Sequence, residues 1–140
     1  PLRLVGSEMC IRDRLKQAHK GWLVWDKGQR GLSMSDCELA YTSFDTPTRI
    51  FTLNRVELQI EGTIHPTQKP VELCEYLIRT YTRPGELVAD ICAGSGTTAV
   101  AAVNTGRRFV CFETAPAFYA PATERIRLAT EAVKAGQKGV

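Results

Sequence analysis

The chain has 140 residues, of which 44% are hydrophobic and 24% charged, and its formal net charge is +3. This composition suits one ordinary soluble domain, and no apolar run is long enough to cross a bilayer. The mild positive charge permits contact with a polyanion but does not by itself indicate one. Five scattered cysteines without a C-x-x-C pair argue against a structural zinc site and a disulfide framework, so we expect reduced thiols, no metal and a cytoplasmic protein.

The first 14 residues differ in kind from the rest. The stretch from Gly6 to Arg14 resembles a translated sequencing-adapter artefact. We therefore treat residues 1–14 as a non-native segment without fold information, and we expect the native domain to occupy residues 15–140.

Short apolar runs separated by turn-forming residues follow in chain order. Residues 22–25 predict a buried strand closed by a turn at 26–29, and residues 37–44 predict a second strand followed by a turn at 45–48. In residues 49–60 basic and apolar residues alternate, which is consistent with an irregular strand pair or with a surface loop.

The second half of the chain alternates between helix and strand signals. Pro70 is predicted at the first position of a helix that runs to Thr80. The further predictions are a turn at 83–86, a buried strand at 87–91, a helix at 97–104 ended by Gly106, a strand at 108–113 and a helix at 118–134. Strands and helices that alternate with short loops predict an α/β fold with a parallel sheet.

The segment Asp90–Thr97 joins a strand end to a helix start through two glycines. Gly94 and Gly96 lack a Cβ and would let a ligand approach the backbone, and the N–H groups at the helix start favour an anion. Glu113, at the end of the next strand, stands where ribose hydroxyls are recognised. The pattern predicts a nucleotide-like ligand, although a dinucleotide site or a purely structural turn would also account for it.

A second motif, the hexapeptide His-Pro-Thr-Gln-Lys-Pro at 65–70, lies about twenty residues before the glycine-rich turn. The two motifs, in this order, resemble the cofactor half of amino-group DNA methyltransferases, which methylate N6 of adenine or N4 of cytosine with S-adenosylmethionine. Residues 22–28 and 35–44 resemble the phage-type adenine methylases of the same family. The resemblance runs from Trp22 to about Arg125 and implies a partial Rossmann-like fold, a mostly parallel sheet with flanking helices.

The resemblance also implies roles for single residues. Lys69 matches the position that contacts the methionine carboxylate, Asp90 would face the positive end of the methionine part, and Glu113 would accept hydrogen bonds from the ribose. Pro-Phe is common in the family where this chain has Ile91-Cys92, which leaves open which apolar side chain covers the cofactor. The expected cofactor-binding residues are Thr67, Lys69, Asp90, Ile91, Cys92, Gly94, Ser95, Gly96, Thr97 and Glu113.

The catalytic motif of the family is missing. The family holds the flipped base with an Asp/Asn/Ser-Pro-Pro-aromatic loop, and no Pro-Pro occurs in this sequence. We therefore expect a truncated reading frame, with no catalytic residue in this chain and no turnover. Double-stranded DNA is the implied partner, and Arg49 and Arg55 either contact its phosphates or guanine edges or are simply solvated.

Two other hypotheses stay open from the sequence. A fragment of an NAD(P)-dependent oxidoreductase would account for the glycine turn and Glu113 but not for the hexapeptide. A non-catalytic module that binds DNA or a partner chain would account for the α/β pattern. The sequence does not decide between adenine and cytosine as the target.

Overall fold

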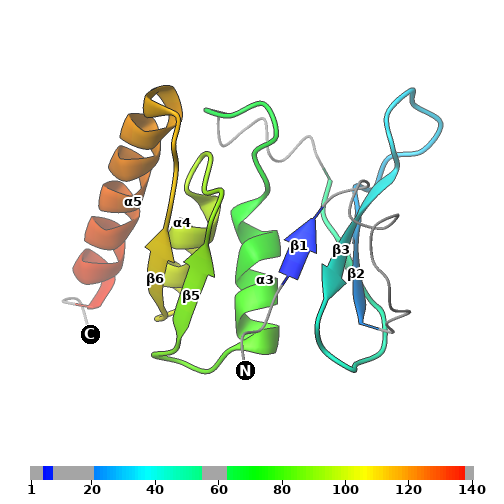
Figure 1. The fold of residues 1–140 in the computed structure, drawn as a ribbon, viewed down its shortest axis with the longest axis horizontal. Helices are drawn as coiled ribbons and strands as arrows, with labels where there is room; N and C mark the ends of the chain where they lie inside the picture. Colours follow the sequence, from blue (N-terminus) through cyan, green and yellow to red (C-terminus); the bar gives the residue numbers. More distant parts are fainter. Residues whose placement is uncertain (1–4, 8–20, 55–62, 138–140) are drawn as a thin grey trace. The chain divides into compact units, whose positions relative to one another are not determined.

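The computed structural model describes residues 5–7, 21–54 and 63–137. The chain divides into two compact units, Pro1–Glu61 and Gly62–Val140, and each contains its own sheet (Figure 1). No helix within the described residues combines the length and the apolar character that a membrane-spanning segment needs.

The first unit is a four-stranded sheet. Its strand order is β1-β3-β2-β4, in which β3 runs antiparallel to both β1 and β2, and β4 runs parallel to β2. The strands are β1 (Val5–Ser7), β2 (Trp22–Asp26), β3 (Cys37–Thr42) and β4 (Arg49–Thr52). The two strands expected at 22–25 and 37–44 are confirmed, and β4 resolves the start of the ambiguous stretch 49–60, whose residues 55–60 lie outside the described part.

Strand β1 lies inside the segment that we expected to carry no fold information. Its three residues pair with Ala40, Tyr41 and Thr42 of β3. This pairing is a structural fact about residues 5–7 only, and the non-native origin of residues 1–14 stays a prediction.

The core of the first unit follows from the alternation along β2. Leu23 and Trp25 are buried, and the alternate residues Trp22, Val24 and Asp26 are half-buried, as a strand with one covered face requires. The indole N–H of Trp25 donates to the Leu53 carbonyl at 3.0 Å, which ties β2 to the end of β4. The buried Lys27 ammonium lies 3.0 Å from a Glu38 carboxylate oxygen and 5.5 Å from the centre of the Trp25 ring.

The second unit contains three helices and a two-stranded parallel sheet. Its elements are α3 (Val71–Tyr81), β5 (Leu87–Asp90), α4 (Thr97–Asn104), β6 (Arg108–Cys111) and α5 (Pro116–Gln137). Helix α4 connects the two strands and packs against both of them, and α3 and α5 pack on either side of it (Figure 1). Its small residues allow this crowding, since Ala99, Ala101 and Ala102 are completely buried.

Element boundaries differ from the predictions in small ways. Pro70 has an extended ψ of 142° and is the N-cap of α3, so the first helical residue is Val71. The helix also continues one residue beyond Thr80. Helix α5 begins before Phe118, because the Ala115 carbonyl already accepts the N–H groups of Phe118 and Tyr119.

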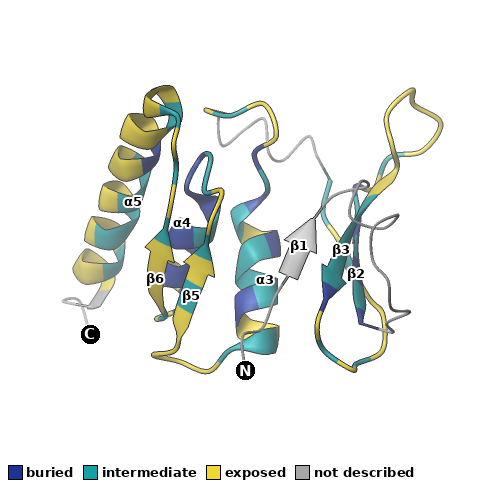
Figure 2. Ribbon diagram, viewed as in Figure 1, coloured by how far each residue is buried: buried dark blue, intermediate teal, exposed yellow. Residues whose placement is uncertain are grey.

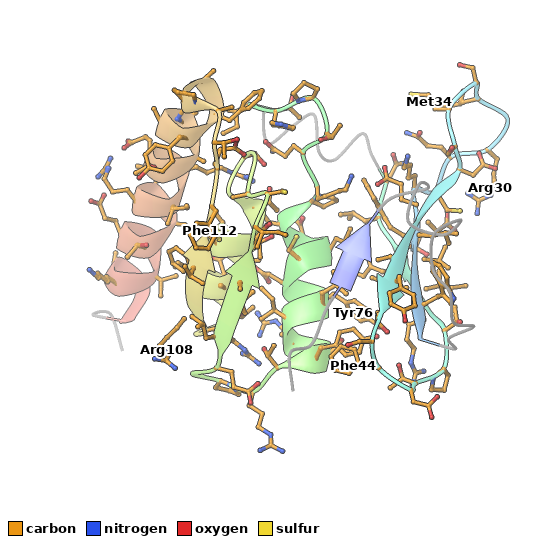
Figure 3. All side chains as sticks on the ribbon, viewed as in Figure 1. Arg30, Met34, Phe44, Tyr76, Arg108 and Phe112 are labelled. Carbon is orange, nitrogen blue, oxygen red and sulfur yellow. The ribbon has the colours of Figure 1, made fainter. Side chains whose placement is uncertain are left out.

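The prediction of a buried strand at 87–91 was wrong for one face of the sheet. Helix α4 covers the side of Val88, whereas Leu87 is 56% exposed and Ile91 80% exposed. Val110 on the neighbouring strand β6 and Phe112 just beyond its end are also exposed (Figures 2 and 3). Among the described residues this sheet has two strands and helices on one face only, so the apolar pattern of β5 meets solvent on the other. We call Leu87, Ile91, Val110 and Phe112 the open face.

Candidate functional site

The predicted site residues come together at the carboxyl end of the β5–β6 sheet. Strands β5 and β6 are adjacent and parallel, with Asp90 paired to Cys111. The pairing continues past both strands, because the Phe112 N–H donates to the Asp90 carbonyl and the Ala93 N–H donates to the Phe112 carbonyl, each at 2.9 Å. Strand β6 ends at Cys111 rather than at the predicted Glu113, which lies two residues beyond the strand and beside the turn that leaves β5.

Asp90 holds the turn to the helix that follows it. One carboxylate oxygen accepts the Cys92 N–H at 3.0 Å, and the other accepts the Thr98 hydroxyl at 2.6 Å. Asp90 thus stabilises the strand-to-helix turn itself, a structural role that was not anticipated. A carboxylate has four acceptor positions, so these two bonds leave capacity for a cationic ligand group.

Glu113 joins the turn to the start of α5. Its two carboxylate oxygens accept the N–H groups of Gly94 and Ala115, each at 2.8 Å. The Ala115 and Gly94 donors hold the pKa of Glu113 below its ordinary value, since they stabilise the charged form. The expected ribose acceptor is therefore an anion fixed in place by backbone donors from two segments.

The backbone conformation of the turn favours glycine at both positions, and the packing of α5 is a second constraint at Gly96. Gly94 and Gly96 have φ values of +51° and +72°, which L side chains rarely adopt. A Cβ at Gly96 would lie 3.2 Å from the Ala122 Cβ of α5, and a Cβ at Gly94 would lie 3.4 Å from the His65 ring. The missing side chain at Gly96 lets α5 approach the turn closely.

A buried hydroxyl network connects the turn to the hexapeptide. Thr97 donates to the Lys69 carbonyl at 3.3 Å, and its hydroxyl lies 2.9 Å from that of Ser95. Both side chains are buried, so their hydroxyls bind protein partners. Any hydrogen bond from Ser95 or Thr97 to a ligand would therefore come from their backbone groups.

Sequence reasoning missed Arg125 as a part of this network. Its guanidinium donates to the Thr97 hydroxyl at 2.9 Å and to the Ser95 carbonyl at 3.2 Å. Arg125 lies on the same side of α5 as Ala122 and Ile126, which face Gly96. The sequence signal that could have found Arg125 is an arginine on the packed face of a helix, because a charged side chain that is half-buried there needs a partner.

The hexapeptide forms a tight turn ahead of α3. Gln68 is buried, and its side-chain carbonyl accepts the Ile64 N–H at 3.2 Å. The backbone N–H of Gln68 donates to the His65 carbonyl at 3.1 Å. Thr67 is exposed and Lys69 half-buried. The contact expected between the Lys69 ammonium and the mouth of the turn stays a prediction.

Ile91 and Cys92 form the exposed part of the turn. Their side chains are exposed, whereas Cys74 and Cys111 are half-buried, and burial raises the pKa of these two thiols to about 12 and about 11. Arg49 is exposed on β4 in the first unit, and Arg55 lies outside the described residues.

Comparison with known proteins identifies this arrangement. Residues 11–124 match the family model for N6/N4 methyltransferases, described as DNA methylase. The chain belongs to the DNA methylase family. The match covers both motifs and leaves the oxidoreductase hypothesis without support, since the hexapeptide and the front strands fall inside the matched range.

Single relatives agree with the family. The chain is 38% identical over 74 residues to the DNA adenine methyltransferase YhdJ of Escherichia coli (strain K12), across 52% of this chain and 25% of YhdJ. It is 39% identical over 61 residues to the type II methyltransferase M.PvuII of Proteus hauseri, across 44% of this chain and 18% of M.PvuII. The matches span less than a third of the length of these curated relatives.

A solved structure supports the fold. The crystal structure of the M1.HpyAVI–SAM complex is similar with a TM-score of 0.62 and 26% sequence identity, over 75% of this chain and 60% of that one. The partial Rossmann-like methyltransferase fold predicted from the sequence is confirmed. The described strand pairs are nevertheless evenly divided, with β2–β4 and β5–β6 parallel and β1–β3 and β2–β3 antiparallel.

Proposed function

We propose that the turn at the carboxyl end of β5 binds S-adenosylmethionine. The observation that carries the proposal is that the hexapeptide and the glycine-rich turn, about twenty residues apart in sequence, are joined by the Thr97–Lys69 hydrogen bond, and that the His65 ring lies beside the face of Gly94 that would bear a Cβ. A relative of similar fold is known as a complex with SAM. Lys69 and the N-terminus of α4 would hold the carboxylate, Asp90 the ammonium group and Glu113 the ribose hydroxyls.

We propose further that the protein is part of a DNA methyltransferase that acts on N6 of adenine or N4 of cytosine in double-stranded DNA. S-adenosylmethionine supplies an activated methyl group on its sulfonium. The relatives include both an adenine enzyme and one titled cytosine-N4-specific, so the proposal includes both adenine and cytosine as target bases. A DNA substrate is consistent with a bacterial or phage-infected cytoplasm, and Arg49 on β4 is a candidate phosphate contact.

Thermal unfolding with and without ligand tests the cofactor. A ligand that binds only the folded chain raises the unfolding midpoint, and a tighter ligand raises it further at the same concentration, so S-adenosylmethionine should raise it and NAD should not. A midpoint that responds to NAD alone would revive the oxidoreductase hypothesis. A chain that responds to neither would contradict the cofactor proposal.

Cysteine labelling locates the site independently. Cys92 lies exposed in the turn, and Cys37 lies exposed in the first unit, where it serves as the internal control. In a C10S variant, S-adenosylmethionine should slow alkylation of Cys92 and leave Cys37 unchanged, because the bound ligand covers the turn. Equal protection of both thiols, or of neither, would contradict the placement of the site.

Methyl transfer by the chain alone should be absent. The reaction needs the exocyclic amine positioned against the methyl group, and no Pro-Pro-aromatic loop is present to do so. The measurement is transfer of labelled methyl to mixed-sequence duplex DNA, with a complete amino-group methyltransferase as positive control. Turnover above background would show that the catalytic residues lie in this chain after all.

A further inference from the structure

We propose that His65 is a positioning residue that latches the hexapeptide across the glycine-rich turn onto Phe118 of α5. The inference rests on the proposed S-adenosylmethionine site and deepens it. It assigns to the His65 ring the task of holding the segment that contains Lys69 in place beside the turn.

The imidazole contacts three segments at once. Its ring centre lies 4.2 Å from that of Phe118, with the two rings inclined at 60°. The face of Gly94 that would bear a Cβ points at the same ring, whose Cδ2, Nε2 and Cγ atoms lie 3.4–3.6 Å from that position. His65 therefore fills the space between the turn and the start of α5.

The Nδ1 atom of the same ring binds the hexapeptide itself. The Thr67 N–H donates to His65 Nδ1 at 3.2 Å, and the Thr67 hydroxyl lies 3.2 Å from the same nitrogen. Because Nδ1 accepts a hydrogen bond, a neutral ring carries its proton on Nε2, the side that faces Gly94. One ring thus combines an acceptor for its own turn with an apolar contact to α5.

The hexapeptide is consequently anchored near both of its ends. The Lys69 carbonyl is bound by Thr97, and His65 is held between Gly94 and Phe118. The Lys69 side chain leaves the backbone at the second anchor, just before the start of α3. Removing the His65 anchor would let residues 64–68 move and would spread Lys69 over more positions, so each contact with the cofactor would cost more entropy.

Sequence reasoning placed His65 in the hexapeptide without assigning it a role. Phe118 lies 53 positions further along the chain, so no local pattern links the two residues. The positive φ of Gly94 turns the face that would bear its Cβ toward the ring.

The experiment is a double-mutant cycle on the full chain, read as the dissociation constant for S-adenosylmethionine. His65→Ala and Phe118→Ala should each weaken binding by about tenfold, as expected for loss of an aromatic pair and a hydrogen bond. The double variant should be no weaker than either single variant, because both changes release the same latch. Tyr119→Ala, adjacent to Phe118 and 58% exposed, is the matched control and should bind as the wild type does.

Two conservative variants separate the parts of the ring. His65→Phe keeps the contact with Phe118 and loses the Nδ1 acceptor, whereas His65→Asn keeps an acceptor near that position and loses the ring. Each should recover part of the affinity that His65→Ala loses. Circular dichroism verifies that every variant is folded, and Phe118→Leu replaces Phe118→Ala if the latter does not fold.

Amide hydrogen exchange of residues 63–70 without ligand distinguishes this inference from the cofactor proposal. His65→Ala and Phe118→Ala should both accelerate exchange there, and Tyr119→Ala should not. Unchanged exchange together with unchanged affinity, or additive losses in the double variant, would overturn the latch. Accelerated exchange in a chain that never binds S-adenosylmethionine would retain the latch and overturn the proposed function instead.

Discussion

The two sides of the β5–β6 sheet differ in how far their side chains are packed or hydrogen-bonded within the protein. On the packed side and at the carboxyl ends of the strands, alanines of α4 are completely buried and Asp90, Glu113, Ser95 and Thr97 all have hydrogen-bond partners. On the open face four large apolar side chains meet solvent. The turn is therefore organised by contacts within the second unit, whereas the open face is an exposed apolar surface.

The largest expected effect on stability comes from adding a Cβ at Gly96. Gly96→Ala combines a positive φ with a Cβ only 3.2 Å from Ala122, so we expect it to lower the free energy of unfolding by about 2–4 kcal/mol. Gly85→Ala is the matched control, since Gly85 also has a positive φ of +79° but nothing lies within 4 Å of its Cβ position. Equal losses in urea unfolding of the two variants would show that α5 does not pack against the turn as described.

The next effect concerns the ligand rather than the fold. Lys69→Ala should weaken S-adenosylmethionine binding by roughly 1–3 kcal/mol, the range for a lost charge-assisted hydrogen bond. Titration calorimetry measures it, with Lys134→Ala at the exposed end of α5 as control. An unchanged dissociation constant would remove Lys69 from the site.

A smaller effect should appear in acid. Because Ala115 and Gly94 lower the pKa of Glu113, its carboxylate stabilises the folded chain above its ordinary pKa of 4.5, and this contribution is lost as the pH falls through the lower folded-state value. In Glu113→Gln the free energy of unfolding should therefore change less steeply between about pH 3 and 5 than in the wild type. Identical slopes in acid unfolding would mean that the two N–H donors do not hold the carboxylate.

The smallest effect on stability is expected on the open face. Leu87→Thr and Phe112→Thr together should change the free energy of unfolding by no more than about 0.5 kcal/mol, because both side chains are already solvated. They should reduce aggregation and the binding of an apolar dye. Val88→Thr, on the packed side of the same strand, is the control and should cost about 1–2 kcal/mol. A large loss from the open-face pair would show that this face is packed in solution.

Much of the second unit was predictable because the signals are local. The strand and helix runs, the turn at 83–86 and the need for glycine at 94 and 96 follow from periodicity and from the conformations a backbone can adopt. The acidic ends of two consecutive strands also predicted that Asp90 and Glu113 would lie at one edge, since parallel neighbours end on the same side. The family itself was visible in the two motifs.

Tertiary structure decided what those residues touch. Whether β5 is buried depends on a second layer over its other face, which no alternation along the strand can reveal. The bonds of Arg125 to the turn and the tilted ring contact of His65 with Phe118 join positions 28 to 53 residues apart. Sequence spacing determines which residues can share a helix face or a strand end, but only the packing of α4 and α5 determines which polar groups are already satisfied and which remain for a ligand.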